Sequence, residues 1–309
     1  MIPSEIRRMF NGKWDWKELS KLIPMSDIRS NPQFHWDREY LSQNTSITIN
    51  DITDSLLTNA VGGWDWRYLS RYIPVSSILQ YPQYPWNKDG LSMNSSLTLS
   101  TMRTLSDRNY QGRWDMFMIS KHISMSQVRD NLEFRWDMIG LSANKELTIG
   151  DIDSLVLPNA TSDWEWWLIS KNMPLSEIRK YPQYPWERSA LNLNPTLTVY
   201  DIHHVKTALE TGNWNWWTIS QNISMDQVRL NPDQPWDKFG LSRNPELRLS
   251  DITTLPLTES VDKWVWTDIS TMIPILDIYQ AKNHVWNREY LSKNRHMRVA
   301  DIITIGGIR

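Results

Sequence analysis

Apolar residues recur in pairs five positions apart along the chain, and each pair encloses a residue suited to begin a helix. Trp14 and Leu19 form the first pair, and Asp15 follows the tryptophan directly. The carboxylate of such an aspartate accepts a free backbone N–H of the first turn, while the tryptophan packs on the leucine. Aspartate or asparagine stands there in nine of twelve cases. The pattern predicts a short helix after each of these tryptophans: Trp14, Trp36, Trp64, Trp86, Trp114, Trp136, Trp164, Trp186, Trp214, Trp236, Trp264 and Trp286.

A second apolar pair with the same spacing follows each of these helices and predicts a second helix. After the first tryptophan this pair is Ile23 and Ile28, and it encloses Pro24. Proline suits the first turn of a helix, where its missing N–H is not needed. Serine replaces the proline in two segments, and a glutamine stands three residues after it. This serine–glutamine spacing is that of a capping box. These two predicted boxes are Ser124 with Gln127 and Ser224 with Gln227.

Every second one of the twelve segments carries an asparagine and, in most cases, a threonine at fixed positions. Thr48 stands at a predicted N-cap with Asp51 three residues later, again in capping-box form. Arg248 and Arg298 interrupt this pattern in the last two of these segments. An asparagine stands just past the first helix of each such segment, and asparagine tolerates the left-handed conformation that ends many helices. We therefore expect that conformation at Asn44, Asn94, Asn144, Asn194, Asn244 and Asn294.

The tryptophan spacing alternates between 22 and 28 residues, which divides the chain into six repeats of 50 residues. We call the 22-residue part of each repeat half A and the 28-residue part half B. Each half holds two helices too short to be stable alone, so neighbouring halves must stabilise one another. The sequence therefore predicts an all-α solenoid that forms a single array over residues 1–309, with repeats starting near residues 14, 64, 114, 164, 214 and 264.

Two other repeat folds share parts of this pattern. β-Propeller blades also contain a Trp-Asp dipeptide, but they consist of four strands and lack periodic helix caps. Leucine-rich repeats of about 20–29 residues match the average half. Glu39 and Asp89, however, stand where that fold buries an apolar side chain. The alternation in "SITI" and "TLTV" leaves a leucine-rich-repeat-like solenoid with short strands as the alternative fold.

Composition excludes several classes of function. The chain contains 19 tryptophans and no cysteine, so disulfides, thiolate nucleophiles and cysteine metal sites are absent. A formal charge of −2 provides no basic surface for nucleic acid or anionic lipid. No apolar run is long enough to span a membrane, and "MIPSEIRRMF" lacks the apolar core of a signal peptide. We expect an intracellular protein that is not secreted and binds neither nucleic acid nor membrane.

Residues with catalytic potential follow the repeat instead of forming a site. Serine follows the leucine or isoleucine in eleven of the twelve segments, with Asn192 as the exception. No histidine or lysine keeps phase with these serines, so we interpret each as a small residue at a close helix contact, its hydroxyl bonded to a carbonyl one turn earlier. The six histidines share no repeat position, and the adjacent His203 and His204 would point in different directions on a helix. We expect no enzymatic activity, no cofactor and no metal site.

The strings "WDWKELSKLI", "PWDKFGLSRNPELRL" and "LNLNPTLTV" resemble the Trp-Asp-Trp/Leu-Ser-x-Asn-Pro repeat proteins of giant nucleocytoplasmic DNA viruses. The resemblance extends from Trp14 to Ile302. Two departures stand out: Asn-Pro occurs in half B only at residues 194–195 and 244–245, and Met116 replaces a tryptophan in the third repeat. The resemblance implies a viral protein, located in the host cytoplasm or in the virus particle, and implies no activity.

A scaffold that binds a protein partner is the function that these features favour, because repeat arrays present long surfaces. A structural component of a virus particle is the alternative, and an enzyme or a nucleic-acid binder fits less well. The third residue after the leading tryptophan of half A varies freely, and in three consecutive repeats it is aromatic. Grouped surface aromatics often mark interaction sites. The candidate partner-binding residues are Phe117, Trp167 and Trp217, unless these side chains fill gaps in the core.

The end of the chain is a second candidate contact. It carries the apolar residues Ile302, Ile303, Ile305 and Ile308, and neither end resembles the polar capping repeat that solenoids normally need. Two interpretations stay open. The isoleucines dock on a partner or on another copy, which would allow end-to-end self-association, or the tail folds back on the last repeat.

Overall fold

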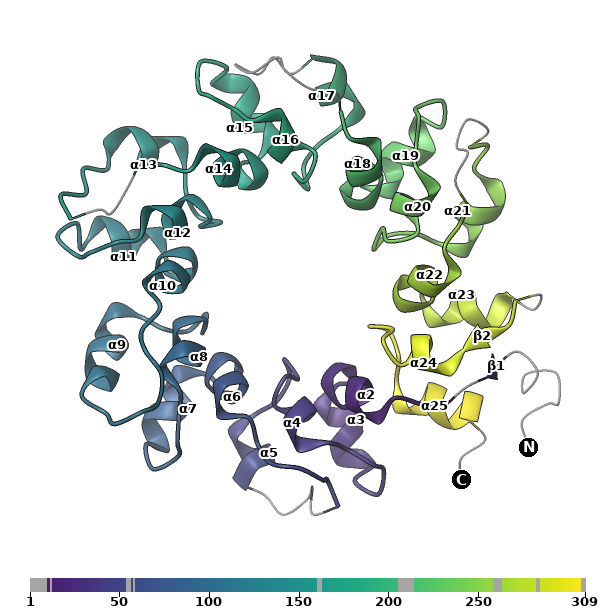
Figure 1. Cartoon of the computed structure of the whole chain (residues 1–309), viewed down its shortest axis with the longest axis horizontal. Coiled ribbons are helices and arrows are strands. Elements are labelled where there is room, and N and C mark those ends of the chain that lie inside the picture. The colour runs from purple at the N-terminus through teal and green to yellow at the C-terminus, as the bar shows by residue number, and fades with distance from the viewer. Residues whose placement is uncertain are drawn as a thin grey trace. The chain divides into compact units, whose positions relative to one another are not determined.

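The computed structural model describes residues 10–11, 13–53, 57, 59–159, 163–204, 214–257, 263–281 and 284–306. Within these residues it contains 24 helices and two strands of two residues each (Figure 1). The helices are short and recur with the 50-residue period of the sequence. The prediction of an all-α repeat solenoid is confirmed. The alternative with a short strand in each half is wrong, since the helix caps override the short alternating segments.

Each half contains a first helix after its tryptophan and then a second helix. The first helices of half A are α2 (Trp16–Leu22), α6 (Trp66–Tyr72), α10 (Met116–His122), α14 (Trp166–Asn172), α18 (Trp216–Asn222) and α22 (Trp266–Met272). The second helices of half A are α3 (Met25–Ser30), α7 (Val75–Gln80), α11 (Met125–Arg129), α15 (Leu175–Lys180), α19 (Met225–Leu230) and α23 (Ile275–Gln280).

Half B repeats this arrangement with shorter first helices. These are α4 (Arg38–Leu41), α8 (Lys88–Ser92), α12 (Met138–Ser142), α16 (Arg188–Leu191), α20 (Lys238–Leu241) and α24 (Arg288–Leu291). The second helices are α5 (Ile49–Thr53), α9 (Leu99–Ser106), α13 (Ile149–Ser154), α17 (Val199–His204), α21 (Leu249–Thr254) and α25 (Val299–Gly306). The strands are β1 (Phe10–Asn11) and β2 (Trp286–Asn287).

The predicted aspartate and asparagine caps begin the first helices. Asp137, for example, accepts the backbone N–H of Gly140 at 2.7 Å. Glu165, Glu187 and Val265 occupy the same position without such a bond, because valine has no acceptor and the longer glutamate does not reach back to the first turn. Side-chain caps of this kind are formed by Asp15, Asp37, Asn87, Asp115, Asp137, Asn215, Asp237 and Asn287.

The two predicted serine–glutamine capping boxes do not form in the described residues. Ser124 accepts no backbone N–H, and Ser224 accepts only that of Asp226, at 3.3 Å. Gln127 donates to the Ser124 hydroxyl through Nε2 at 3.2 Å, and it accepts the N–H of Leu99 through Oε1 at 3.0 Å. Its side chain thus bonds to the predicted serine and also ties α11 to the preceding repeat.

In half B the capping box of the second helix does form. Thr148 and Asp151 bond reciprocally, and Asp51 accepts the N–H of Thr48 at 2.8 Å. The arginine that interrupts the pattern in the fifth repeat leaves the helix start intact. Asp251 accepts the N–H of Arg248 at 2.8 Å, so the aspartate supplies the cap without its threonine partner.

The asparagine at the end of each half-B first helix has a different role from the predicted one. No described residue other than glycine has a positive φ, so these asparagines are not left-handed. The buried amide of Asn144 donates to the carbonyls of Ser120 and Ile123 at 2.9 and 2.8 Å, and its Oδ1 accepts the N–H of Glu146. It therefore joins half B to the end of helix α10 in half A. The same two donated bonds are formed by Asn44, Asn94, Asn194 and Asn294.

The tryptophan that begins each half B forms the centre of the core. Each of these rings is at most 2% exposed. Trp186 packs edge-to-face on Trp166 with ring centroids 5.4 Å apart, and its Nε1 donates to the carbonyl of Tyr181. The six buried rings are Trp36, Trp86, Trp136, Trp186, Trp236 and Trp286.

The recurring serine links successive halves. Ser142 donates to the carbonyl of Met138 at 2.7 Å, one turn earlier, as predicted. Its oxygen also accepts the N–H of Glu165, the cap residue of the next repeat, at 2.9 Å. Asn192 takes the place of serine in the fourth repeat, and its Oδ1 accepts the equivalent N–H. The serine therefore belongs to the architecture of the repeat.

The described chain divides into two compact units. Unit 1 consists of residues 1–65 and 224–309, and unit 2 of residues 66–223. Within unit 2 the first helices form a row in which α10 packs on both α8 and α12, with the second helices along one side of the row (Figure 1). None of the described helices is long and apolar enough to cross a membrane.

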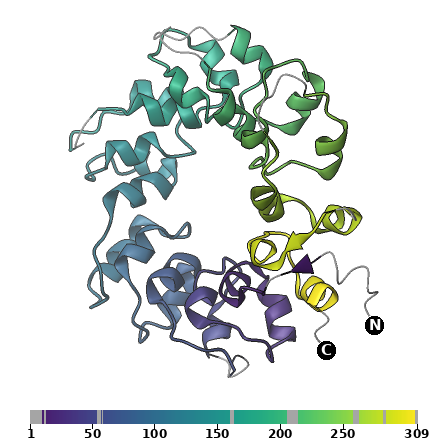
Figure 2. The same ribbon diagram turned by 45° about the vertical axis from the view of Figure 1, so that its right-hand side comes forward.

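The first and last repeats meet inside unit 1. Strand β1 pairs in parallel with β2, with Asn11 opposite Asn287 (Figure 2). Ser292 accepts the N–H of Asp15 at 2.9 Å. Equivalent contacts join the first repeat to the second. Asp37 forms a parallel bridge with residue 61, and Ser42 accepts the N–H of residue 65. The last half B therefore holds the first half A by the same bond at the serine position that joins consecutive repeats elsewhere.

Candidate functional site

The three candidate aromatic residues lie at the same place on three first helices of unit 2. Phe117, Trp167 and Trp217 are the second residues of α10, α14 and α18. The first two side chains are half-buried, and Trp217 is 38% exposed. None of the three is a core residue with a fully buried ring. Each presents part of an aromatic surface to solvent and part to the protein.

The backbone under Phe117 packs closely on the next first helix. A Cβ atom added to Gly140 would lie 2.4 Å from the Phe117 carbonyl oxygen and 2.9 Å from Cβ of Ser120. Gly90 has the same relation to the carbonyl of Arg67, at 2.0 Å. Helix α12 can approach α10 this closely only without a side chain at that point. Phe117 is therefore held on a rigid helix–helix junction.

The candidate position and the residue across this junction are never both aromatic in one repeat. Phe117 lies across from a glycine, and the equivalent of that glycine next to Trp167 is Ala190. In the first repeat the position holds Tyr40, whose ring centre lies 5.4 Å from Nζ of Lys17. Rings on half A thus accompany glycine or alanine on half B, and the half-B rings Tyr40 and Tyr290 accompany the non-aromatic Lys17 and Thr267. The sequence carries this signal as a correlation between positions 23 residues apart, which sequence reasoning missed.

A further exposed apolar side chain lies on the helix between two of those that carry candidate rings. Ile139, the second residue of α12, is 44% exposed. Its helix packs on both α10 and α14, which carry Phe117 and Trp167. Three successive first helices therefore expose apolar surface at their N-terminal turns.

Basic side chains accompany these apolar groups. The ammonium of Lys171 lies 5.5 Å from the Trp167 ring centre, within the range of a cation–π contact. On the neighbouring repeats, burial lowers the pKa of His122, and the positive charges of Lys121, Arg71 and Lys145 lower it further. Lysines therefore accompany two of the three aromatic positions, Lys121 on the helix of Phe117 and Lys171 on the helix of Trp167, although the whole chain is slightly acidic.

The isoleucines at the end of the chain fall into three groups. Ile302 and Ile305 are completely buried on α25, whereas Ile303 is 37% exposed. Ile308 lies outside the described residues. The backbone carbonyl of Ile305 also accepts a hydrogen bond from Arg288 at 3.1 Å. The described part of this tail is packed on the last repeat.

The histidines do not converge. His203 and His204 point apart on α17 with ring planes at 84°, and His204 stacks on Tyr200. Among the residues that the structure describes, no group of three or more histidine, aspartate or glutamate side chains could hold a metal ion.

No family model, no curated protein and no solved structure matches this chain. The candidate site is therefore interpreted from its own geometry. Partly exposed rings on rigid helices, with cations beside them, can bind a segment that offers apolar anchors and negative charge.

Proposed function

We propose that the protein is a non-enzymatic repeat scaffold that binds a protein partner through an aromatic row on unit 2. We use the name aromatic row for the three rings Phe117, Trp167 and Trp217 together with the aliphatic side chain of Ile139. The observation that carries the proposal is the recurrence of partly exposed rings at one repeat position on three successive half-A helices. A viral origin, which the sequence resemblance implies, is part of this proposal.

The position of the rings favours binding over packing. Other repeats carry Lys17, Arg67 and Thr267 at the same place and build the same helices there. The fold therefore does not require an aromatic side chain at this position. Aromatic residues on a rigid backbone lose little conformational entropy when a partner covers them, which suits them as anchors.

The charge around the row defines the chemistry of the partner. Lys121 and Lys171 stand one turn after Phe117 and Trp167, whereas Gln221 takes that place after Trp217. A partner segment with aromatic or aliphatic anchors and flanking aspartate or glutamate would complement both features. Its association should weaken at high salt, because exposed charges are screened.

A displayed random-peptide library tests this proposal. Peptides selected on the immobilised protein should contain apolar anchors flanked by acidic residues. Their affinity should fall at least tenfold for a variant with Phe117→Lys, Trp167→Arg and Trp217→Lys. These replacements resemble the residues that other repeats carry, so the variant should keep its helix content and unfold within about 1 kcal/mol of the wild type.

A matched control separates the row from general surface effects. Leu79, Leu132 and Val156 are exposed apolar residues of unit 2 outside the row. Changing all three to lysine adds the same charge and should leave peptide binding unchanged. Equal binding of the selected peptides to the folded row variant and to the wild type contradicts the proposal. Unfolding of the row variant would show that the rings are packing residues.

A further inference from the structure

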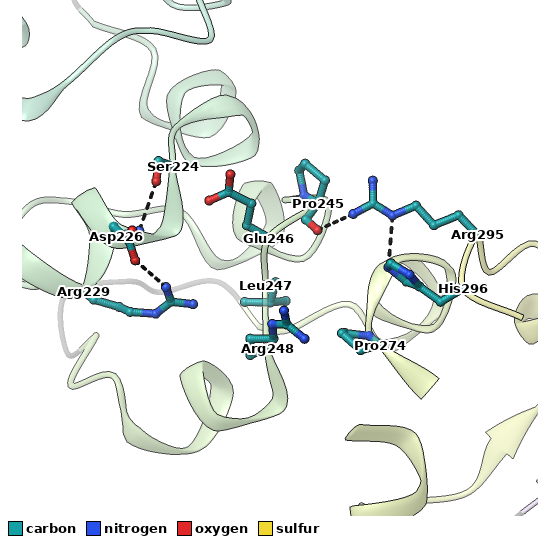
Figure 3. A pocket seen from close by; sticks show the side chains of 10 residues that line it. All are labelled: Ser224, Asp226, Arg229, Pro245, Glu246, Leu247, Arg248, Pro274, Arg295 and His296. Atoms are coloured by element: carbon teal, nitrogen blue, oxygen red, sulfur yellow. Dashed lines mark hydrogen bonds and ion pairs between the residues drawn. The ribbon is translucent and has the colours of Figure 1, made fainter. Parts of the chain in front are cut away.

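Three departures from the repeat pattern occur together in unit 1, away from the aromatic row. Position 48 of the repeat is threonine in the first four repeats and arginine in the last two, and Arg248 is the arginine of the fifth repeat. Positions 45 and 46 of the last repeat carry Arg295 and His296, where the other repeats have no arginine and no histidine. In a repeat protein, positions shared by all repeats maintain the fold, so departures indicate local demands. Here the three side chains line one pocket (Figure 3).

The pocket has a volume of about 680 Å³, which is in the range of small-molecule sites. It lies between half B of the fifth repeat and the neighbouring parts of the fifth and sixth repeats. Leu247, Pro245 and Pro274 supply apolar lining, and Arg248 and Arg295 reach it from different repeats (Figure 3). Arg248 also lines a smaller neighbouring pocket of about 390 Å³.

Arg295 is held in place by contacts that leave its charge unneutralised. Its guanidinium donates to the carbonyl of Pro245 at 2.6 Å and to Nε2 of His296 at 3.2 Å. Within the described residues, neither it nor Arg248 forms an ion pair. Arg229, by contrast, pairs with both Asp226 and Asp251 and is already neutralised.

Both carboxylates in the lining have partners in the fold, but only Asp226 pairs with a cation, so Glu246 keeps its negative charge in the lining. Oε2 of Glu246 accepts the N–H of Met225 at 2.9 Å, as Glu146 does for Met125 in the third repeat. Glu246 therefore belongs to the repeat architecture, where it helps to begin α19. The remaining lining carboxylate, on Asp226, is occupied by Arg229.

Arg248 and Arg295 also act electrostatically on the same group. Burial lowers the pKa of His296, and the charges of Arg295 and Arg248 lower it further, against a hydrogen bond with the backbone of Met272 that raises it. Two cations that influence one imidazole from two repeats create a positive region inside a concave, partly apolar site. Paired arginines are well suited to phosphate, whose oxygens accept two parallel N–H bonds from each guanidinium.

We propose that this pocket binds a phosphate monoester of a small organic molecule. Arg248 and Arg295 would hold the phosphate, and Leu247, Pro245 and Pro274 would contact the organic part. The volume exceeds that of a phosphate ion alone, which favours an esterified ligand over the free ion. This site is separate from the aromatic row, and it does not depend on the proposed partner.

Titrations with AMP, glucose 6-phosphate and inorganic phosphate test the proposal, followed by NMR of the His296 side chain and by calorimetry. A bound phosphate dianion should raise the pKa of His296, because it offsets the two neighbouring cations. We expect the phosphate monoesters to bind more tightly than inorganic phosphate. The binding constant should fall as salt increases.

The repeat itself supplies the variants. Arg248→Thr restores the residue of the first four repeats and should weaken monoester binding at least tenfold while leaving the fold intact. Arg298→Thr makes the same change one repeat later, outside the pocket lining, and should leave binding unchanged. Arg295→Ser should weaken binding as Arg248→Thr does.

Three results would overturn the proposal. One is the absence of any ligand-dependent change at His296 in the folded wild-type protein. Another is monoester binding that is equally strong in Arg248→Thr and in Arg298→Thr, which would place the phosphate elsewhere. Preference for inorganic phosphate over both monoesters would also contradict it.

Discussion

The hydroxyl of Ser292 accepts a hydrogen bond from the backbone N–H of Asp15 across 277 positions of the sequence. The bond length, 2.9 Å, equals that between Ser242 and the N–H of Val265, where one repeat follows another along the chain. Arg298 and Asp27 add an ion-pair contact at 3.8 Å to the same junction. The first and last repeats are therefore joined by the contact that joins consecutive ones.

Removing the hydroxyl at this junction should destabilise the fold as it does between consecutive repeats. Ser292→Ala leaves a partly buried N–H without its acceptor, and we expect a loss of about 1–2 kcal/mol in urea titrations. Ser242→Ala, which breaks the equivalent bond, should cost the same within experimental error. A silent Ser292→Ala beside a destabilising Ser242→Ala would show that the two ends do not meet in solution.

A circular permutant should fold. Joining Arg309 to Phe10 keeps the repeat phase, because a residue 310 would correspond to residue 10 after six periods of 50. New ends between Arg108 and Asn109 fall in an exposed connection of unit 2. Circular dichroism should show wild-type helix content. A permutant that joins Arg309 to Lys13 omits β1 and should be less stable, and failure of the first permutant to fold would contradict the assigned junction.

Two glycines should respond oppositely to alanine. Gly140→Ala places a methyl group 2.4 Å from the Phe117 carbonyl and should destabilise the fold by about 1–3 kcal/mol. Gly150 has only a Thr148 hydroxyl at 3.7 Å and lies within α13, so Gly150→Ala should stabilise it by about 0.5–1 kcal/mol. Thermal unfolding measures the stability of both variants. A Gly140→Ala variant as stable as the wild type would refute the close approach of α10 and α12.

Replacing a bridging asparagine should be among the most damaging single changes. Asn144→Leu removes the amide that serves two buried carbonyls, and we expect a loss of about 3 kcal/mol in denaturant titrations. Asn159→Ala is the control, since that exposed amide donates only to the carbonyl of Glu133, and it should change stability by less than about 0.5 kcal/mol. Similar losses of stability in Asn144→Leu and Asn159→Ala would show that the buried amide of Asn144 has no special role.

The acid stability of the repeats should depend on the partner of one buried aspartate. Burial raises the pKa of Asp151, but the hydrogen bonds from Arg129 and Thr148 outweigh it and hold that pKa below its ordinary value. In the last repeat Tyr279 replaces the arginine, and burial keeps the pKa of Asp301 above its ordinary value. A lowered pKa stabilises the fold above the unfolded pKa, and a raised one destabilises it as pH increases.

Tyr279→Arg should therefore lower the pKa of Asp301. Its stability relative to the wild type should increase as pH rises from below 4 through the raised pKa of the wild-type aspartate. Carboxyl NMR titration and urea titrations at several pH values measure both quantities. Arg129→Tyr is the reciprocal change and should raise the pKa of Asp151. Unchanged carboxyl titrations in both variants would show that the guanidinium does not control these pKa values.

The sequence by itself determined the period, the halves and the helix starts. Trp136, Asp137 and Leu141 begin a helix through interactions between residues close together in the sequence. Such short-range interactions can be predicted from any one segment. Because the pattern repeats twelve times, chance agreement between segments is excluded. The bond from the serine hydroxyl to a carbonyl one turn earlier, as in Ser142, also follows from local chemistry, whereas the deeper burial of the half-B tryptophans was not predicted.

Only the tertiary structure decided which distant groups satisfy one another. Asn144 serves carbonyls 21 and 24 residues away, so its local pattern suggested a helix stop and concealed a bridge. Arg248 and Arg295 share a pocket although 47 positions separate them, and Asp15 bonds to Ser292 across 277 positions. A local sequence pattern reflects the interactions among residues within one helical turn. The pairing of partners across halves depends on the path of the folded chain, which no single segment contains.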